Sequence, residues 1–297
     1  MKYGFLENVD AVDFKLPPEH IHTKSILESL QKTSIPKVYI GGPVFSDKSF
    51  KGTLYPSKTP QSKFLAEYAK QFNSIEVNST RYGMIKIDTL KRWAAMVDDR
   101  FRFSFKLPQV ISHRKSIIDN DAMHRMDQFI VALSEIYDKV GTTYMLMPSY
   151  FKMDRFGELE QFVKSIPLDL RFSIEFRNAE IQNHSEIIAL LTENNISMTI
   201  TDTAGQRDTV HKILTNDELF IRFLGNRLHK SDYERIEEWG IQISEWINRG
   251  LKQVYFFIHQ PSPQKYLCGQ LAAYLVEKLK EFGIQSSMIK PTDFSSQ

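Results

Sequence analysis

Short apolar segments recur along the chain from Lys37 onward, separated by longer stretches with a different hydrophobic spacing. In many of them apolar and polar residues alternate, the period of two that a half-buried β-strand produces. Phe172, Ile174 and Phe176, for example, alternate with polar residues. Strands are predicted at residues 37–42, 74–78, 102–106, 143–147, 171–176, 197–202, 219–223 and 254–259.

The stretches between these segments carry hydrophobic residues three and four positions apart, which is the spacing of one face of an α-helix. Such stripes occur within residues 64–72, 126–137, 187–191, 239–247 and 267–275. Thr59 and Pro60 precede the first stripe, as an N-cap residue and a first-turn proline do. The chain is therefore predicted to alternate between strands and helices.

Eight strands, most of them followed by a helix, predict a (β/α)8 barrel of the TIM type. An open doubly wound sheet is the alternative, but it usually carries a glycine-rich phosphate-binding turn after its first strand. The corresponding segment here, IGGPVFSDKS, lacks that glycine spacing. We expect residues 37–297 to form a single barrel domain and residues 1–36 to form an N-terminal extension packed on it.

The composition is that of an ordinary globular protein, with 42% hydrophobic and 25% charged residues. A net charge of +2 without a lysine- and arginine-rich block argues against nucleic acid as the main partner. The one cysteine, Cys268, excludes an internal disulfide and a cysteine-based zinc site. The chain shows neither a signal-peptide pattern nor an apolar run of membrane-spanning length, so a cytoplasmic protein without a membrane partner is expected.

Charged side chains lie on the polar faces of the predicted strands. Glu76 and Asn78 share a face of the second strand, Lys106 ends the third, and Glu175 and Arg177 lie on the fifth. The later strands add Asp202, Arg222 and His259 near their ends. Because active sites of (β/α)8 barrels form at the C-terminal ends of the strands, these residues are predicted to line a polar mouth.

These charges fit either structural ion pairs inside the barrel or a functional pocket. A single carboxylate such as Glu175 can simply neutralise a neighbouring cation. Eight polar residues from six strands are harder to explain in that way, because burying charges is costly unless they are paired or bind something. A functional pocket is therefore the favoured interpretation.

Several short segments support this interpretation by their order along the chain. They are LYP (54–56), FNSIEVNSTRY (72–82), Trp93, FRFSFKLP (101–108), SH (112–113), SIEFRN (173–178), TDTAG (201–205), IRFLG (221–225) and VYFFIH (254–259). In order and spacing they resemble the landmarks of the YecE-like proteins, the family known as domain of unknown function 72. The resemblance covers residues 37 to about 280 and implies a (β/α)8 barrel with a site, but no established activity.

The resemblance also implies which residues form the pocket and where this chain diverges. The shared residues are Glu76, Lys106, His113, Glu175, Arg177, Asp202 and Arg222. Leu146 stands where a glutamine is usual, Leu224 where a histidine is usual and His259 where an asparagine is usual. A Phe-Tyr pair is replaced by Arg81-Tyr82, and a Gly-Trp by residues 43–45. The chain is interpreted as a divergent branch of the family.

Two arginines and a lysine beside carboxylates favour an enzyme that binds a small anionic ligand, phosphorylated or sugar-like, with carboxylate acid–base chemistry. The predicted substrate-binding residues are Arg177, Arg222, Lys106, Asn78, Tyr82 and His259. The predicted catalytic residues are Glu175 or Glu76 as general base, His113 as an acid, and Asp202. His259 is an alternative acid.

Two other hypotheses stay open. A metal-dependent phosphodiesterase or nuclease acting on nucleic acid would use Glu76, Glu175, Asp202 and His259 as ligands. The chain has no HxH or HExxH pair and the arginines would repel a cation, so no metal or other cofactor is predicted. A non-catalytic binding protein is the third hypothesis, favoured by the apolar Leu146 and Leu224. The sequence does not indicate an oligomeric state.

Overall fold

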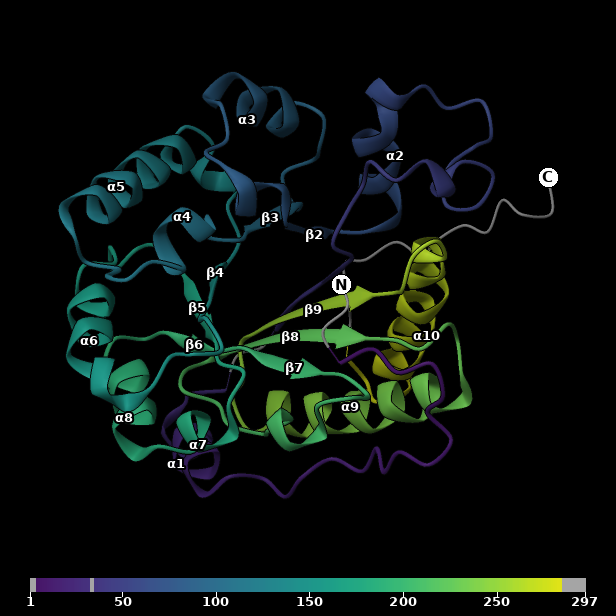
Figure 1. The fold of residues 1–297 in the computed structure, drawn as a ribbon. Helices are drawn as coiled ribbons and strands as arrows, with labels where there is room; N and C mark the ends of the chain where they lie inside the picture. The colour runs from purple at the N-terminus through teal and green to yellow at the C-terminus, as the bar shows by residue number, and fades with distance from the viewer. Residues whose placement is uncertain (1–3, 33–34, 285–297) are drawn as a thin grey trace.

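The computed structural model describes residues 4–32 and 35–284, except for the side chains of residues 81 and 82. Parallel strands enclose the middle of the molecule, and helices pack around them (Figure 1). The strands are β1 Lys37–Gly41, β2 Ser74–Val77, β3 Arg102–Phe105, β4 Thr143–Leu146, β5 Phe172–Glu175, β6 Ser197–Met198, β7 Ile200–Asp202, β8 Glu218–Leu224 and β9 Gln253–His259.

The helices follow the strands in the expected alternation, with short additional turns in the loops. They are α1 Ile21–Ser29, α2 Phe64–Gln71, α3 Ile87–Ala94, α4 Gln109–Ser112, α5 Asn120–Ser134, α6 Phe156–Lys164, α7 Ala179–Gln182, α8 Ser185–Glu193, α9 Lys230–Asn248 and α10 Cys268–Glu281. None of them has the length and apolar character that crossing a bilayer needs, within the residues that the structure describes.

The strands close into a ring through three parallel sheets, ordered β1-β9-β8-β7, β2-β3 and β4-β5-β6. An isolated bridge between Lys106 and Tyr144 joins the β3 side to β4. The Glu76 N–H donates to the Gly42 carbonyl at 3.1 Å and joins β2 to β1. Only residue 199 separates β6 from β7. The predicted (β/α)8 barrel is confirmed.

The sixth predicted strand, residues 197–202, is divided into β6 and β7 at Thr199. β6 pairs with β5, whereas β7 pairs with β8. Near this break the Met198 N–H donates to the Thr215 hydroxyl at 3.0 Å, so a loop side chain takes the place of a strand partner. Thr199 still donates its N–H to the Ile174 carbonyl at 2.9 Å, which keeps the ring continuous.

β1 and β2 approach each other too closely for an ordinary side chain between them. A Cβ atom on Gly41 would lie 2.0 Å from the Ser74 carbonyl oxygen, so only glycine fits. The Asn73 side chain accepts from the Ile40 N–H and donates to the Val38 carbonyl, each at 2.8 Å. One amide side chain thus replaces part of a strand ladder at this junction.

The hydrophobic core has two parts. The larger part lies between the strands and the surrounding helices, and it includes the fully buried Trp239 and Trp246 of α9. A smaller cluster consists of Tyr39, Tyr144, Phe220, Tyr255 and Phe257. Those residues come from β1, β4, β8 and β9 and pack together inside the barrel, where they form an aromatic layer.

The N-terminal strap, defined here as residues 4–20, runs along the outside of the barrel beside α9 (Figure 1). Glu19 accepts hydrogen bonds from Trp246 Nε1 at 2.6 Å and from Arg249 Nη1 at 2.8 Å. At the other end of the strap the Gly4 carbonyl accepts from the Gly205 N–H at 2.8 Å. The strap therefore extends from α9 to the loop that follows β7.

Candidate functional site

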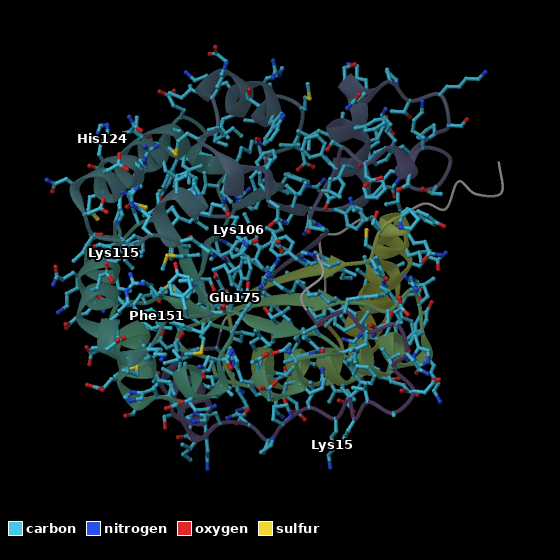
Figure 2. All side chains as sticks on the ribbon, in the orientation of Figure 1. Lys15, Lys106, Lys115, His124, Phe151 and Glu175 are labelled. Carbon is cyan, nitrogen blue, oxygen red and sulfur yellow. The ribbon has the colours of Figure 1, made fainter. Side chains whose placement is uncertain are left out.

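Arg222 of β8 lies at the centre of a buried charge cluster inside the barrel. Its Nε and Nη2 donate to the two carboxylate oxygens of Glu76 at 3.0 and 2.9 Å. Its Nη1 donates to Glu175 Oε2 at 2.6 Å. All three side chains have 0% exposure, so one buried guanidinium joins β2, β5 and β8 by direct contacts. Lys106 and Glu175 lie in the middle of the molecule in Figure 2.

The Glu76 carboxylate accepts further hydrogen bonds from three other residues. Tyr144 Oη donates to Glu76 Oε1 at 2.7 Å, and Asn78 Nδ2 donates to the same oxygen at 2.6 Å. His259 Nε2 lies 2.8 Å from Glu76 Oε2. Because each lone pair of this carboxylate meets a donor, Glu76 is held in one orientation at the mouth of the barrel.

The surrounding cations keep both carboxylates ionised. Burial alone would raise the pKa of Glu175, but Arg222, Arg177 and Lys106 lower it to about 2. Burial opposes ionisation of Glu76 too, yet the Arg222 guanidinium, together with the hydrogen bond from His259, holds the pKa of Glu76 well below the usual range. Arg177 contributes through its Nε, which donates to Glu175 Oε1 at 3.0 Å. Carboxylates with such low pKa values are weak proton acceptors at neutral pH.

Lys106 follows β3 and lies in the same cluster, with 3% of its surface exposed. Its Nζ lies 5.3 Å from the centroid of the Tyr144 ring. Among the residues that the structure describes, none accepts a hydrogen bond from Nζ or forms an ion pair with it. Burial, with Arg222 as the next largest cause, lowers the pKa of Lys106 to about 7.

His259 is buried at the end of β9, with 6% exposure. Burial lowers the pKa of its imidazole despite the adjacent Glu76 carboxylate, so the ring is neutral at pH 7. In the neutral form that fits this geometry, Nε2 carries the proton and donates it to Glu76. His259 thus supports the carboxylate without adding charge to the cluster.

Two layers below the charge cluster contain residues that the sequence did not single out. Arg222 and Lys106 both lie over the Tyr144 ring, with 5.2 Å between the Arg222 Cζ and the ring centroid. Deeper still, Glu218 accepts from Thr142 Oγ1 at 2.7 Å and Gln253 Nε2 at 2.6 Å. The alternation Glu218, Phe220, Arg222 along β8 is a pattern that could have indicated these layers.

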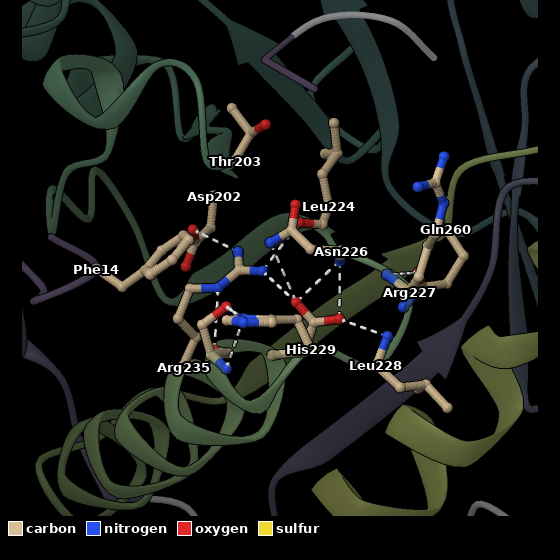
Figure 3. A network of polar contacts seen from close by, with 12 residues as sticks. Phe14, Asp202, Thr203, Leu224, Asn226, Arg227, Leu228, His229, Arg235 and Gln260 are labelled. Carbon is tan, nitrogen blue, oxygen red and sulfur yellow. Dashed lines mark hydrogen bonds and ion pairs between the residues drawn. The ribbon is translucent and has the colours of Figure 1, made fainter. Parts of the chain in front are cut away.

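Asp202 belongs to a different network, between β7 and α9 (Figure 3). Its Oδ1 accepts from Arg235 Nη1 at 2.9 Å and from Arg207, and its Oδ2 accepts from Trp239 Nε1 at 2.7 Å. Arg235 also donates to Asp232 Oδ1 at 2.7 Å. With two carboxylates and two guanidinium groups, this network is electrically balanced by its own residues.

The loop after β8 turns its backbone N–H groups towards a carboxylate. Arg227 and Leu228 have φ angles of 60° and 63°, and backbone N–H groups that converge in such a turn form a concave anion site. Asp232 fills that site, because it accepts from the Asn226 N–H at 2.8 Å and from the Leu228 N–H at 3.0 Å. Asn226 and Leu228 are labelled in Figure 3. This loop therefore holds a side chain of its own chain, at a position where many barrels bind phosphate.

A hollow opens beside the charge cluster, at the ends of β7, β8 and β9. Its wall includes His259 and Leu224, together with Gly4 and Phe5 of the N-terminal strap. The Arg227 guanidinium carbon lies 5.2 Å from the centroid of the Phe5 ring. His259 thus faces two environments, since it contacts Glu76 and also lines this hollow.

The remaining predicted site residues lie as follows. His113 comes directly after α4, and its Nδ1 lies 2.8 Å from the Ser112 hydroxyl. Leu146 is buried and stands opposite Glu175 in the register of β4 and β5. Tyr82 ends a short turn after β2, but its side chain is outside the described part of the structure. Across residues 4–32 and 35–284, no group of three or more His, Cys, Asp or Glu side chains is arranged to hold a metal ion.

The fold defines a (β/α)8-barrel protein, and its buried charge cluster lies towards the C-terminal ends of the strands. The model of the family described as "Protein of unknown function DUF72" matches residues 39–292, and the chain belongs to this family. The UPF0759 protein YecE of Escherichia coli K12 is 25% identical over 219 residues, which cover 66% of this chain and 79% of that protein.

Crystal structures of two DUF72 family proteins have the same fold. The protein from Enterococcus faecalis V583 has a TM-score of 0.66 at 17% identity, covering 84% of this chain and 99% of that chain. The protein from Thermotoga maritima MSB8 has a TM-score of 0.62 at 22% identity, covering 83% and 99%. The resemblance noted from sequence motifs is therefore confirmed, and no activity comes with it.

Proposed function

We propose that this protein is an enzyme that binds a small anionic molecule at the mouth of its barrel, with Lys106 as the group that exchanges protons. The observation that carries the proposal is the position of Lys106. Its amine is buried among the charged side chains of the cluster, and no described residue accepts a hydrogen bond from it. The described residues give this lysine no hydrogen bond in return for its desolvation, so its position is not explained by stability.

The charges of the cluster support an anionic ligand. Glu76 and Glu175 are balanced by Arg222 and Arg177, and neutral His259 adds no charge. Protonated Lys106 therefore leaves the cluster with one surplus positive charge. A phosphate or carboxylate group placed beside Lys106 would neutralise that charge and favour the protonated form.

The roles of the two glutamates change with respect to the sequence-based hypothesis. Because Arg222 lowers the pKa of both carboxyl groups, we assign Glu76 and Glu175 to orienting the cations of the cluster. Lys106 has a pKa of about 7, and a group of this pKa gives up and takes back a proton readily near neutral pH. Lys106 is therefore our candidate for general acid–base chemistry.

The expected orientation of the ligand in the site follows from the exposure of the cationic side chains. Arg177 comes after β5, and 17% of its side chain is exposed, whereas Arg222 is fully enclosed by the two glutamates. The anion site of the loop after β8 is filled by Asp232. We therefore expect the anionic group of the ligand near Lys106 and Arg177, with His259 on the far side of the site.

The test is a thermal-shift titration with inorganic phosphate, sugar phosphates and small carboxylates. At about a hundred times its dissociation constant, a ligand adds roughly 2.7 kcal/mol to the free energy of unfolding. We expect one of these anions to raise Tm in the wild type, and the shift to be lost in Lys106→Met and Arg177→Ala. Lys212→Met is the matched control, because Lys212 donates to Gln242 Oε1 at 2.8 Å, away from the cluster.

Other outcomes would contradict the proposal. A Tm shift that survives both Lys106→Met and Arg177→Ala would place the anion elsewhere. A shift only with divalent ions or short DNA would favour a metal-dependent phosphodiesterase. Binding of an anion at Lys106 without turnover of any tested substrate would favour a non-catalytic binding protein.

A further inference from the structure

Backbone hydrogen bonds on both sides of Lys106 fix the position from which its side chain extends. The Lys106 N–H donates to the Val77 carbonyl at 3.1 Å, and the Lys106 carbonyl accepts from Thr80 Oγ1 at 2.6 Å. The residue also bridges Tyr144 on the neighbouring strand. Because both peptide groups are held, the four-carbon side chain starts from one position and carries its amine over the Tyr144 ring. Such a rigid support is what a covalently reacting residue requires.

The surroundings of the amine are those of a nucleophilic lysine. Burial and the neighbouring Arg222 and Arg177 guanidinium groups lower the pKa of Lys106, so a large fraction is uncharged at neutral pH. An uncharged amine has a free lone pair and attacks carbonyl carbons, and desolvation or a nearby cation is the usual means of activating it. A lowered pKa is enough for proton exchange by Lys106. The held backbone and the Tyr144 ring, in addition, restrict the direction from which a substrate can approach the amine.

We propose that Lys106 forms an imine with the carbonyl carbon of a small substrate that also carries a carboxylate or phosphate group. This inference rests on the proposed function, because it places the anionic group beside Arg177 and adds a carbonyl next to the amine. The substrate class is thus a small oxo acid or a phosphorylated aldehyde or ketone.

The chemistry balances without a cofactor. The Lys106 nitrogen adds to the carbonyl carbon, and one amine proton moves to the carbonyl oxygen to give a carbinolamine. The C–O bond then breaks, and the hydroxyl leaves as water with the second amine proton, while a C=N bond forms. Uptake of one proton from solvent gives the cationic imine, which faces the Glu76 and Glu175 carboxylates that favour positive charge at this position. Addition of water reverses the sequence and releases the product.

The test is reductive trapping in the full-length protein. Sodium cyanoborohydride delivers hydride to a protonated imine and converts it into a stable secondary amine, which peptide mass mapping locates. Two matched pairs of probes isolate the anionic group: glyoxylate against acetaldehyde for carboxylate, and pyridoxal 5′-phosphate against pyridoxal for phosphate. We expect Lys106 to be labelled at least about ten-fold faster than the average surface lysine by one of the anionic probes, because an amine with a pKa of about 7 is largely uncharged at pH 7.5.

The pH profile gives a second readout that accessibility alone would not produce. Labelling of Lys106 should rise about ten-fold between pH 6 and 8 and then level off, as the amine titrates near pH 7. Labelling of ordinary surface lysines should keep rising beyond pH 9. Lys212 is the internal control, since its pKa is lowered by burial but it lies outside the cluster.

The outcomes separate this inference from the proposed function. Labelling of Lys106 at the rate of surface lysines, or equally by the charged and uncharged member of each pair, would overturn the imine with an anionic carbonyl compound. If phosphate or a carboxylate still raised Tm through Lys106 and Arg177, the proposed anion site would stand without the imine. If neither the trapping nor the thermal shift involved Lys106, both the imine and the proposed anion site would be wrong.

Discussion

Lys106 is the residue at which stability and proposed function oppose each other. Its amine is desolvated and close to Arg222, so protonating it in the folded protein costs free energy. The unfolded chain has no such penalty. A side chain kept at this position against stability is typical of functional sites, where a strained or unsatisfied group is part of the chemistry.

The first prediction concerns Lys106→Met and pH. The pKa of Lys106 is lowered from 10.5 to about 7, so between these values the unfolded chain binds a proton that the folded protein lacks. Stability from this residue therefore rises with pH, by about 2 kcal/mol between pH 7 and pH 9. Lys106→Met removes this slope and raises stability at pH 7. Urea denaturation of both proteins at pH 7 and pH 9 measures the free energy of unfolding. An equal change with pH in the wild type and in the variant would contradict the prediction.

The second prediction concerns Glu175→Gln in acid. The pKa of Glu175 is lowered from 4.5 to about 2, so its stabilising effect is complete above pH 4.5 and is lost as the pH falls through about 2. The variant should be less stable by about 3 kcal/mol at pH 7, and by less than half of that at about pH 3. Chemical denaturation across this range measures the difference, and a difference that does not change with pH would show that charge is not the cause.

At the scale of strands and helices, the alternation of polar and apolar residues along uninterrupted strands could be predicted from the sequence. Glu76, Lys106, Glu175 and Arg222 were predicted to gather because of their places on or directly after the polar faces of continuous strands. Ion pairs join Glu76, Glu175 and Arg222, and the charges of these three side chains act on Lys106. Asp202 was grouped with them from its place at a strand end. Its side chain instead reaches α9, because the strand is interrupted at Thr199 and the alternation cannot be followed through the break.

The sequence did not indicate several hydrogen-bond partners of the charged residues, and those of Asp202 come from a helix and a loop. Arg235 and Trp239 are separated from Asp202 by more than thirty positions, and nothing in their local pattern indicates the contact. Tyr144 lies in a predicted strand whose other residues are mostly apolar, and its hydroxyl bond to Glu76 depends on how the strands tilt around the barrel. The charged strand faces and most of the strands were thus predictable from the sequence, whereas the contact of Tyr144 and the helix partners of Asp202 were not.

The third prediction tests the separation between the two networks. Asp202→Asn leaves Arg207 and Arg235 with one negative charge fewer, and we expect a loss of stability of about 3–5 kcal/mol. Anion binding at Lys106 should stay within about two-fold of the wild type, since the ion pairs of Asp202 are with Arg207 and Arg235 and not with the Lys106 cluster. Urea denaturation and the anion titration measure the two effects. A loss of anion binding in a folded Asp202→Asn protein would show that Asp202 belongs to the site.

At the scale of the whole molecule, the N-terminal strap links the outside of the barrel to its mouth. Phe14 lies in the middle of the strap and contacts the Asp202 network (Figure 3). The guanidinium carbon of Arg235 is 4.8 Å from the Phe14 ring centroid and 4.2 Å from that of Phe223. Glu19 anchors the strap to α9. The strap thus has an anchored part, residues 14–20, and an end that reaches the hollow beside His259.

The fourth prediction separates these two parts of the strap. Gly4 has a φ angle of 64°, and a Cβ atom there would lie 2.3 Å from Thr203 Oγ1, so Gly4→Ala should release the end of the strap from the loop after β7. Because Gly4 and Phe5 form part of the wall of the hollow, we expect weaker anion binding with less than about 1 kcal/mol lost in stability. Phe14→Ala, in contrast, removes contacts to Arg207 and Arg235 and should destabilise the protein by about 2–4 kcal/mol.

Hydrogen exchange of residues 4–10, together with the anion titration, measures the effect of Gly4→Ala. Faster exchange in this segment with weakened anion binding would show that the strap end completes the site, since the barrel and the Arg222 cluster are untouched by the substitution. Faster exchange with unchanged binding would limit the strap to a structural role on the outside of the barrel. Unchanged exchange would contradict the expected clash with Thr203, because the segment would then have kept its bonds to Thr203 and Gly205.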